Sequence, residues 1–188
     1  MARGDRGRWE QTHNRLISTA LDLFEHQGYE QTTAGQIAQV AGVTEMTFFR
    51  HFSAKHRVLI GDPYDPVIVG AVAAQPKDRH PLLRAISGIR RAWDDLPIPD
   101  EETVRRRIRV VARTPSLWGE MRSGTAETEA LVADQLVADG SDPLVARVVA
   151  AAVLAGVTAA LLEWSQSDDN SLSHFLTRSL DALDHDDG

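Results

Sequence analysis

The residues best suited to chemistry lie between positions 32 and 52, in the stretch TTAGQIAQVAGVTEMTFFRHF. Thr33 and Gln36 have the spacing of a capping box, in which both side chains satisfy free backbone N–H groups at a helix start. Thr44 can cap a second helix in the same way. Gly42 lies between the two helices and supplies the permissive backbone of a tight turn. The spacing predicts a helix-turn-helix, which sets a recognition helix into the DNA major groove.

The second predicted helix has one apolar and one polar face. Phe48 lies four residues before Phe52, so both are expected to face inward, while Glu45, Met46, Thr47 and Arg50 face outward. A methionine side chain can contact a thymine methyl group. Two roles stay open for Glu45, because its carboxylate can accept from a cytosine amine or can complement the positive end of the helix.

The flanking segments must hold this motif in place. Upstream, a stripe of apolar residues at helical spacing ends at Gly28 and comprises Leu16, Ile17, Ala20, Leu21 and Phe24. Downstream, Ser53 is expected to start another helix that has Lys55 in its first turn.

This segment, from Arg15 to Leu59, resembles the N-terminal domain of TetR-family transcriptional regulators. The residues that carry the resemblance are Ala20, Leu21, Phe24, Gly28, Tyr29, Thr32, Thr33, Ile37, Ala38, Ala41, Gly42, Val43, Thr44, Thr47, Phe48, Phe49, His51, Phe52 and Lys55. The resemblance implies an all-α protein with an N-terminal three-helix DNA-binding domain in residues 1–57. A larger helical ligand-binding and dimerisation bundle is expected in residues 58–188.

The resemblance also implies which residues meet double-stranded operator DNA. The expected set is Thr33, Thr44, Glu45, Met46, Thr47, Phe49, Arg50, His51 and Lys55. Within it, Met46, Thr47 and Arg50 are expected at bases, and Thr33, His51 and Lys55 at phosphates. One position departs from the family, which usually has a tyrosine where this chain has Phe49. The ring can still stack, but the hydroxyl that would bond a phosphate is missing.

Composition limits the remaining possibilities. The chain has 188 residues, no cysteine and a net charge of −7. Disulfides, thiol nucleophiles and cysteine-ligated zinc are therefore excluded, and the chain fits a reducing cytoplasm. The charge is unevenly divided, because residues 1–57 carry +1 and residues 58–188 carry −8. The acidic part thus lies away from the predicted motif, and weak nonspecific DNA binding is expected.

Neither the N-terminus nor the longest apolar run has the pattern of a targeting or membrane segment. The opening MARGDRGRW is polar, so no signal peptide is expected. Arg3, Arg6 and Arg8 are expected to form a loose basic arm before the first helix, which is either a disordered tail or a contact to the minor groove or to phosphates. The apolar run from Val148 to Leu162 is shorter than a membrane span needs and predicts a buried helix without membrane contact.

The second region is predicted to be all-helical, which gives nine or ten helices in the whole chain. Asp62–Pro63 and Asp65–Pro66 are expected helix starts. The pairs Thr114–Pro115 and Asp142–Pro143 are each expected to open another helix. The predicted helices cover residues 66–75, 81–93, 100–113, a segment after 115, 143–165 and 171–183.

Small residues four positions apart mark the apolar run, namely Ala152, Gly156 and Ala160. They would let another helix approach closely. The family resemblance implies a homodimer that forms through the C-terminal helices. The two chains of the dimer are expected to bind a pseudo-palindromic operator together. The alternative is an ordinary core helix within one chain.

Large apolar residues on the middle helices suggest an effector cavity, since helix bundles often contain such pockets. The expected ligand-binding residues are Trp93, Arg109, Trp118 and Met121, although aromatic residues at this spacing also serve as core. Arg105, Arg109 and Arg113 share a face that is either solvated or directed at an anionic head group.

The C-terminal part also resembles an actinobacterial branch of the family that includes mycofactocin-system regulators. Some members respond to acyl-coenzyme A thioesters, so the expected effector is small and mostly apolar, such as an acyl-CoA. No cofactor and no metal are expected.

An enzyme is the rival class of function. The chain has no GxSxG, Walker, GxGxxG or HExxH motif, so no catalytic residues are assigned. The sequence therefore predicts a ligand-responsive transcriptional regulator, most simply a repressor. The alternative is a helical dimeric interaction module that has lost specific DNA binding.

Overall fold

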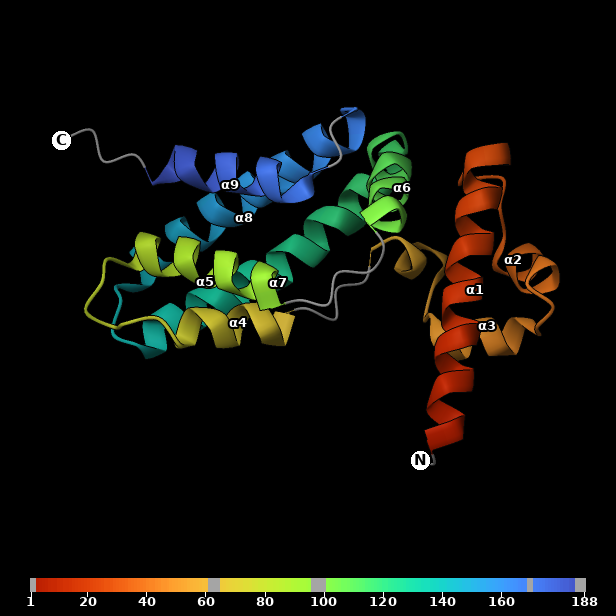
Figure 1. Ribbon diagram of the computed structural model, residues 1–188, viewed down its shortest axis with the longest axis horizontal. Helices are drawn as coiled ribbons and strands as arrows, with labels where there is room; N and C mark the ends of the chain where they lie inside the picture. Colours follow the sequence, from red (N-terminus) through yellow and green to blue (C-terminus); the bar gives the residue numbers. More distant parts are fainter. Residues whose placement is uncertain (1–2, 61–64, 96–100, 169–170, 185–188) are drawn as a thin grey trace. The chain divides into compact units, whose positions relative to one another are not determined.

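The computed structural model describes residues 3–60, 65–95, 101–168 and 171–184, and these contain helices but no strand (Figure 1). The α-helices are α1 (Arg3–Gln27), α2 (Ala34–Val40), α3 (Glu45–His51), α4 (Asp65–Ala73), α5 (Pro81–Asp95), α6 (Glu101–Ala112), α7 (Trp118–Ala138), α8 (Pro143–Gln166) and α9 (Leu172–Leu183). Two 3₁₀ helices, η1 (Lys55–Val58) and η2 (Pro115–Leu117), complete the set. The predicted all-α class is confirmed.

The chain divides into two compact units. The first contains residues 1–61 and 102–120, and the second contains residues 62–101 and 121–188. Almost all of α6 thus groups with the N-terminal helices. The sequence-based boundary after residue 57 stays a prediction.

The first unit is built around α1. The predicted stripe on this helix is buried, with Leu16, Ala20 and Leu21 fully inaccessible, and Ile37 and Phe48 from α2 and α3 are equally buried. A charged contact fixes α6 to the same helix: the Arg106 guanidinium bonds Asp22 and Glu25 of α1, each at 2.6 Å. These contacts hold the helices that carry the predicted motif.

Two expectations for the first unit are wrong. Residues from Arg3 onward continue α1, so no loose arm precedes the first helix. No α-helix starts at Ser53 either, because the chain forms only the 3₁₀ turn Lys55–Val58, and Ala54 at its start offers no side-chain cap. Without a capping side chain, Ser53–Ala54 stays outside the helix.

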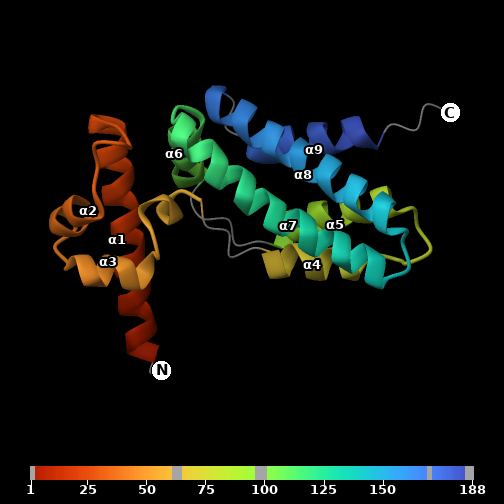
Figure 2. The same ribbon diagram turned by 180° about the vertical axis from the view of Figure 1, so that it is seen from behind.

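The second unit packs α4, α5, α7, α8 and α9 around one apolar core (Figure 2). Its fully buried members are drawn from every one of these helices and include Val72, Ala85, Val132, Val153 and Leu180. Gly88 allows α4 and α5 to approach closely, since a Cβ there would lie 2.6 Å from the Val72 Cα. The absence of a side chain at this position is therefore a packing requirement.

Sequence signals for helix starts hold in the second unit. Asp142 accepts from the backbone N–H groups of Leu144 and Val145 at 2.9 and 3.1 Å and caps α8. Ser171 caps α9 through the His174 N–H. Asp65 lies in the first turn of α4 and accepts from the Thr128 hydroxyl at 2.8 Å, whereas Asp62–Pro63 lies outside the described residues. These caps are local, which is why the sequence reveals them.

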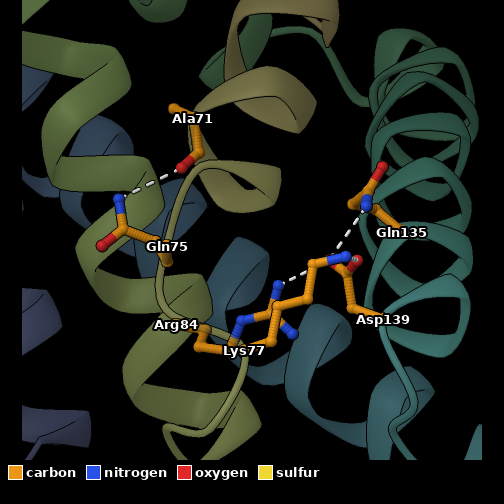
Figure 3. Close-up of polar contacts among 6 residues, drawn as sticks. All are labelled: Ala71, Gln75, Lys77, Arg84, Gln135 and Asp139. Atoms are coloured by element: carbon orange, nitrogen blue, oxygen red, sulfur yellow. Dashed lines mark hydrogen bonds and ion pairs between the residues drawn. The ribbon is translucent and has the colours of Figure 1, made fainter.

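An ionic cluster around the buried Asp139 carboxylate joins the N-terminal end of α5 to the residue that follows α7 (Figure 3). Asp139 accepts from Arg84 and Lys77, each at 2.6 Å, and from Gln135 at 2.9 Å. The Lys77 ammonium, Gln135 and Arg84 hold the pKa of the Asp139 carboxyl far below its usual range, in that order of effect. Because the Arg84 side chain is 1% exposed, its charge depends on this carboxylate for compensation.

Helix α8 has two distinct apolar faces. On one, Gly156 receives α9: the Ser179 hydroxyl donates to the Gly156 carbonyl at 2.6 Å, and a Cβ at residue 156 would lie 3.0 Å from that hydroxyl. At least at Gly156, the small residues serve packing within the chain, as the alternative interpretation held. On the other face Leu144 and Val148 are 72% and 59% exposed.

Candidate nucleic-acid interface

The α2–turn–α3 segment forms the predicted motif through local hydrogen bonds. The capping box is present, with Thr33 Oγ1 accepting from the Gln36 N–H at 3.1 Å and the Gln36 side chain accepting from the Thr33 N–H at 2.9 Å. Thr44 Oγ1 accepts from the Thr47 N–H at 3.1 Å and starts α3. Gly42 has a φ of 68° and makes the turn, a conformation that favours glycine.

Besides Glu45, three side chains of α3 project into solvent. Met46 is 83% exposed and Phe49 is 48% exposed, and Arg50 is exposed as well. Two large exposed apolar side chains on one short helix suit contact with a partner. The face thus offers an apolar, a flat aromatic and a cationic group together, which is the mixture that base edges and phosphates can engage.

The remaining α3 and cap residues are partly committed to the fold. Thr33 and Thr44 use their hydroxyls as caps, and Thr47 Oγ1 lies 2.9 Å from Thr44 Oγ1. The Glu45 carboxylate lies over α2, with one oxygen 3.5 Å from the position of a Cβ on Gly35. That place, beside the first turns of both short helices, favours the interpretation of Glu45 as a complement to positive helix ends.

His51 belongs to an aromatic cluster that joins α3 to α1. Its ring lies 4.8 Å from Trp9 and 5.6 Å from His13, while His13 stacks on Phe52 at 4.6 Å. Burial lowers the pKa of His51, and the neighbouring Arg50 lowers it further. Burial lowers the pKa of His13 too, followed by the charges of His51 and Arg107. Both rings therefore favour the neutral form at neutral pH, and His51 is poorly suited to be a positive phosphate contact.

Lys55 is held inside the first unit. Its ammonium donates to the Tyr29 carbonyl at 2.8 Å and to the Thr32 carbonyl at 2.9 Å, and lies 3.8 Å from the Tyr29 ring centroid. These contacts tie η1 to the turn that follows α1. The arrangement favours a positioning role, while the phosphate contact expected from the sequence stays a prediction.

The four expected effector residues are divided between the two units. Arg109 and the exposed Trp118 belong to the first, and Trp93 and Met121 to the second. On the shared arginine face, Arg105 is 5% exposed, Arg109 is half-buried and Arg113 is exposed. Of the four, only Trp93 lines the cleft of about 210 Å³ between α5 and α9.

Sequence reasoning missed the contribution of α1 to this surface. Trp9 is 40% exposed and stacks on His13 at 4.7 Å, next to the C-terminal end of α3. The spacing of Trp9 and His13, four residues apart, would have indicated a helical pair had the helix been extended to its true start. Arg106, which lies far away in sequence, gave no such signal.

Comparison with known proteins agrees with this architecture. Residues 16–60 match the family model described as bacterial regulatory proteins, tetR family, and residues 80–186 match the MftR C-terminal domain. The chain is 33% identical over 187 residues to the HTH-type transcriptional regulator TcmR of Streptomyces glaucescens, covering 92% of this chain and 82% of that protein. The mycofactocin-related character of the C-terminal part is thus confirmed at the level of the domain family.

Solved structures show the same fold. SmeT of Stenotrophomonas maltophilia in complex with triclosan aligns with a TM-score of 0.61 at 18% identity, covering 92% of this chain and 90% of that chain. NalD of Pseudomonas aeruginosa, a repressor of a multidrug efflux pump, aligns with a TM-score of 0.55 at 20% identity, covering 95% and 98%. With a helix-turn-helix, a helical second unit and matches along most of its length, the chain belongs to the TetR family of DNA-binding transcriptional regulators and not to a class of enzymes.

Proposed function

We propose that this protein is a cytoplasmic, ligand-responsive repressor that binds a pseudo-palindromic operator as a homodimer. The observation that carries the proposal is the exposed face of α3, where Met46, Phe49 and Arg50 project from a helix capped by Thr44. Met46, Thr47 and Arg50 approach base edges, and the Thr33 end of α2 meets the phosphate backbone. Recognition helices in such dimers are spaced roughly 34–36 Å apart, about one turn of DNA.

The homodimer forms through the second apolar face of α8. Leu144, Val145 and Val148 are 72%, 40% and 59% exposed, and exposed alanines at 151, 155 and 159 continue the same helical face. By length and composition α8 could also cross a membrane, and 33% of its most apolar window is buried. A second copy of the chain accounts for this exposed surface without a membrane, because like faces pair across a twofold axis.

DNA binding is tested by electrophoretic mobility shift and footprinting on the DNA upstream of the protein's own gene, over a series of salt concentrations. We expect a protected pseudo-palindrome and a binding constant that falls steeply with salt. Arg50→Ala should weaken binding and lower the salt slope by about one if it meets a phosphate, or relax preference at one position if it meets a base. Equal, weak binding to all sequences would instead favour an interaction module.

The oligomeric state is tested by sedimentation. We expect a dimer at micromolar concentration, and we expect Val148→Glu to weaken it at least about tenfold because it buries an unpaired charge. Val67→Glu is the matched control, since Val67 is 39% exposed on α4 of the same unit. A monomeric wild type with full operator affinity would contradict the dimer.

Release by a small, mostly apolar effector completes the proposal. A ligand shifts the DNA-bound state only through a different affinity for the two conformations of the dimer. SmeT, which has the same fold, has been solved in complex with triclosan. This supports an effector site in the helical unit of the present chain.

A further inference from the structure

Among the buried donors of the second unit that have no acceptor in the described residues, two lie on neighbouring turns of α5. Arg90 Nε and Trp93 Nε1 have no hydrogen-bond partner among the described residues. Buried N–H groups are almost always paired in folded proteins, so an orphan donor calls for an explanation. These two lie three residues apart on α5 and therefore share a face of that helix.

The side chains that carry these donors, Arg90 and Trp93, line the same cleft. It holds about 210 Å³ between α5 and α9, and its walls also contain Ile89, Leu176 and Leu180. An apolar cavity of about 150 Å³ is enough for benzene, so this volume suits a molecule with one ring. An acyl-CoA, which was expected from the sequence, is far too large for it.

The charges around the cleft select the kind of acceptor. Arg90 Nη2 already bonds the Asp181 carboxylate at 2.5 Å, which compensates the guanidinium charge. Asp94, which lines the cleft and is exposed, adds a second carboxylate. An anionic ligand would meet net negative charge, whereas a neutral oxygen would satisfy the free donors without repulsion.

We propose that the α5–α9 cleft binds a small uncharged molecule of about one ring that carries a carbonyl oxygen. The oxygen accepts from Trp93 Nε1 and Arg90 Nε, and the ring packs against Ile89, Leu176 and Leu180. A carbonyl oxygen has two lone pairs and can serve two donors. For this cleft we therefore propose a ligand with a neutral polar group, whereas the sequence had suggested an anionic head group.

The position of the cleft connects it to the proposed dimer face. Its second wall, α9, packs on α8, where Ser179 bonds the Gly156 carbonyl. A ligand that shifts α9 acts on the helix whose opposite face carries Leu144 and Val148. The effector role of the cleft rests on the proposed function, but binding itself does not.

The binding step is tested with three probes on the full chain, namely acetophenone, its near-isostere α-methylstyrene, which lacks the oxygen, and benzoate, which is an anion. The readout is the set of indole N–H signals in ¹H–¹⁵N spectra, assigned by single Trp→Phe variants. We expect acetophenone to shift the Trp93 signal saturably and to bind about fivefold to tenfold more tightly than α-methylstyrene. Benzoate should bind more weakly than acetophenone.

Two conservative variants test the donors. Trp93→Phe and Arg90→Lys each remove one orphan N–H, and the lysine can still pair with Asp181. Each should weaken acetophenone binding about fivefold. Arg91→Lys is the matched control on α5, because the exposed Arg91 side chain pairs with Asp95 and does not line the cleft, and it should leave the affinity unchanged. If Trp93→Phe fails to fold, Arg90→Lys and the comparison of the three probes still test whether the donors bind the ligand oxygen. Equal affinity for acetophenone and α-methylstyrene, or no loss in either variant, would overturn the proposal.

Operator binding is measured separately on the same samples. Failure of every form to bind DNA would overturn the proposed function and leave the site intact, because the spectra alone judge binding. Saturation by acetophenone that changes operator affinity less than twofold would remove the effector role of the cleft. Operator release at the concentrations that shift the Trp93 signal would support both.

Discussion

The two units differ in the sequence separation of the residues that form their candidate functional sites. In the first unit, the α2–α3 motif is contained in about twenty consecutive residues, and its caps connect positions three residues apart. In the second, the α5–α9 cleft brings together residues near 90 and near 177. The α2–α3 motif is therefore defined by hydrogen bonds between neighbouring residues, whereas the cleft forms only when the helices of the second unit pack together. Damage to packing should impair the two regions unequally.

The largest difference should come from the ionic cluster around Asp139. Asp139→Ala leaves the Arg84 guanidinium buried and uncompensated, so we expect the second unit to lose about 3–5 kcal/mol of stability. Urea unfolding followed by hydrogen exchange in α7 and α1 measures the effect in each unit. Asp95→Ala, which breaks an exposed pair with Arg91, is the control and should cost less than about 1 kcal/mol. Equal losses in both variants would show that the cluster is not essential.

A packing change gives the next effect. Gly88→Ala places a Cβ against the Val72 backbone and should cost about 1–3 kcal/mol, because neither helix backbone can yield cheaply. Gly70→Ala, at an exposed position of α4, has open space around the new methyl group and should stabilise the chain by up to about 1 kcal/mol. Thermal unfolding of the pair measures the contrast. A stabilising Gly88→Ala would mean that α4 and α5 can separate freely.

In the first unit, Lys55 separates a positioning role from a phosphate role. Lys55→Ala removes two hydrogen bonds to carbonyls and the contact with the Tyr29 ring, and should destabilise this unit by about 1–2 kcal/mol. If the role is positioning, the salt slope of operator binding stays the same. If Lys55 also neutralises a phosphate, as the sequence suggested, the slope falls by about one. Titration of operator affinity against salt decides between them.

The smallest effect is a difference in acid sensitivity. The pKa values of His13 and His51 are lowered by burial, so the unfolded chain binds protons more readily and the first unit loses stability as pH falls below about 6.5. The lowered pKa of Asp139 acts in the same direction in the second unit, but only below about pH 4. Hydrogen exchange at pH 7.5, 5.5 and 3.5 should show α1 weakening before α7. Simultaneous loss would contradict this order.

Sequence reasoning succeeded where neighbouring residues determine the outcome. The caps at Thr33, Thr44, Asp142 and Ser171 use donors within three residues, and the α1 stripe follows directly from helical period. The predicted helix boundaries were wrong at the start of α1 and at Ser53, because the residues that mark a helix end are only weak predictors of its position.

Long-range contacts could not be predicted at all. Lys55 meets carbonyls 23 and 26 residues away, and Arg106 meets carboxylates more than 80 residues away. Of the four expected effector residues, only Trp93 lines the cleft. The other three could not be judged from the sequence, because contacts within a bundle depend on how the helices cross, and helical periodicity does not contain that information. The DNA contacts expected at α3 are still to be measured.

The exposed face of α8 has a consequence for gene dosage. If two copies pair through Leu144 and Val148, the DNA-binding species below the dimer dissociation constant rises with the square of the protomer concentration. A twofold change in synthesis would then change the amount of active regulator about fourfold. The cellular level of the chain would thus act as a second input beside any ligand.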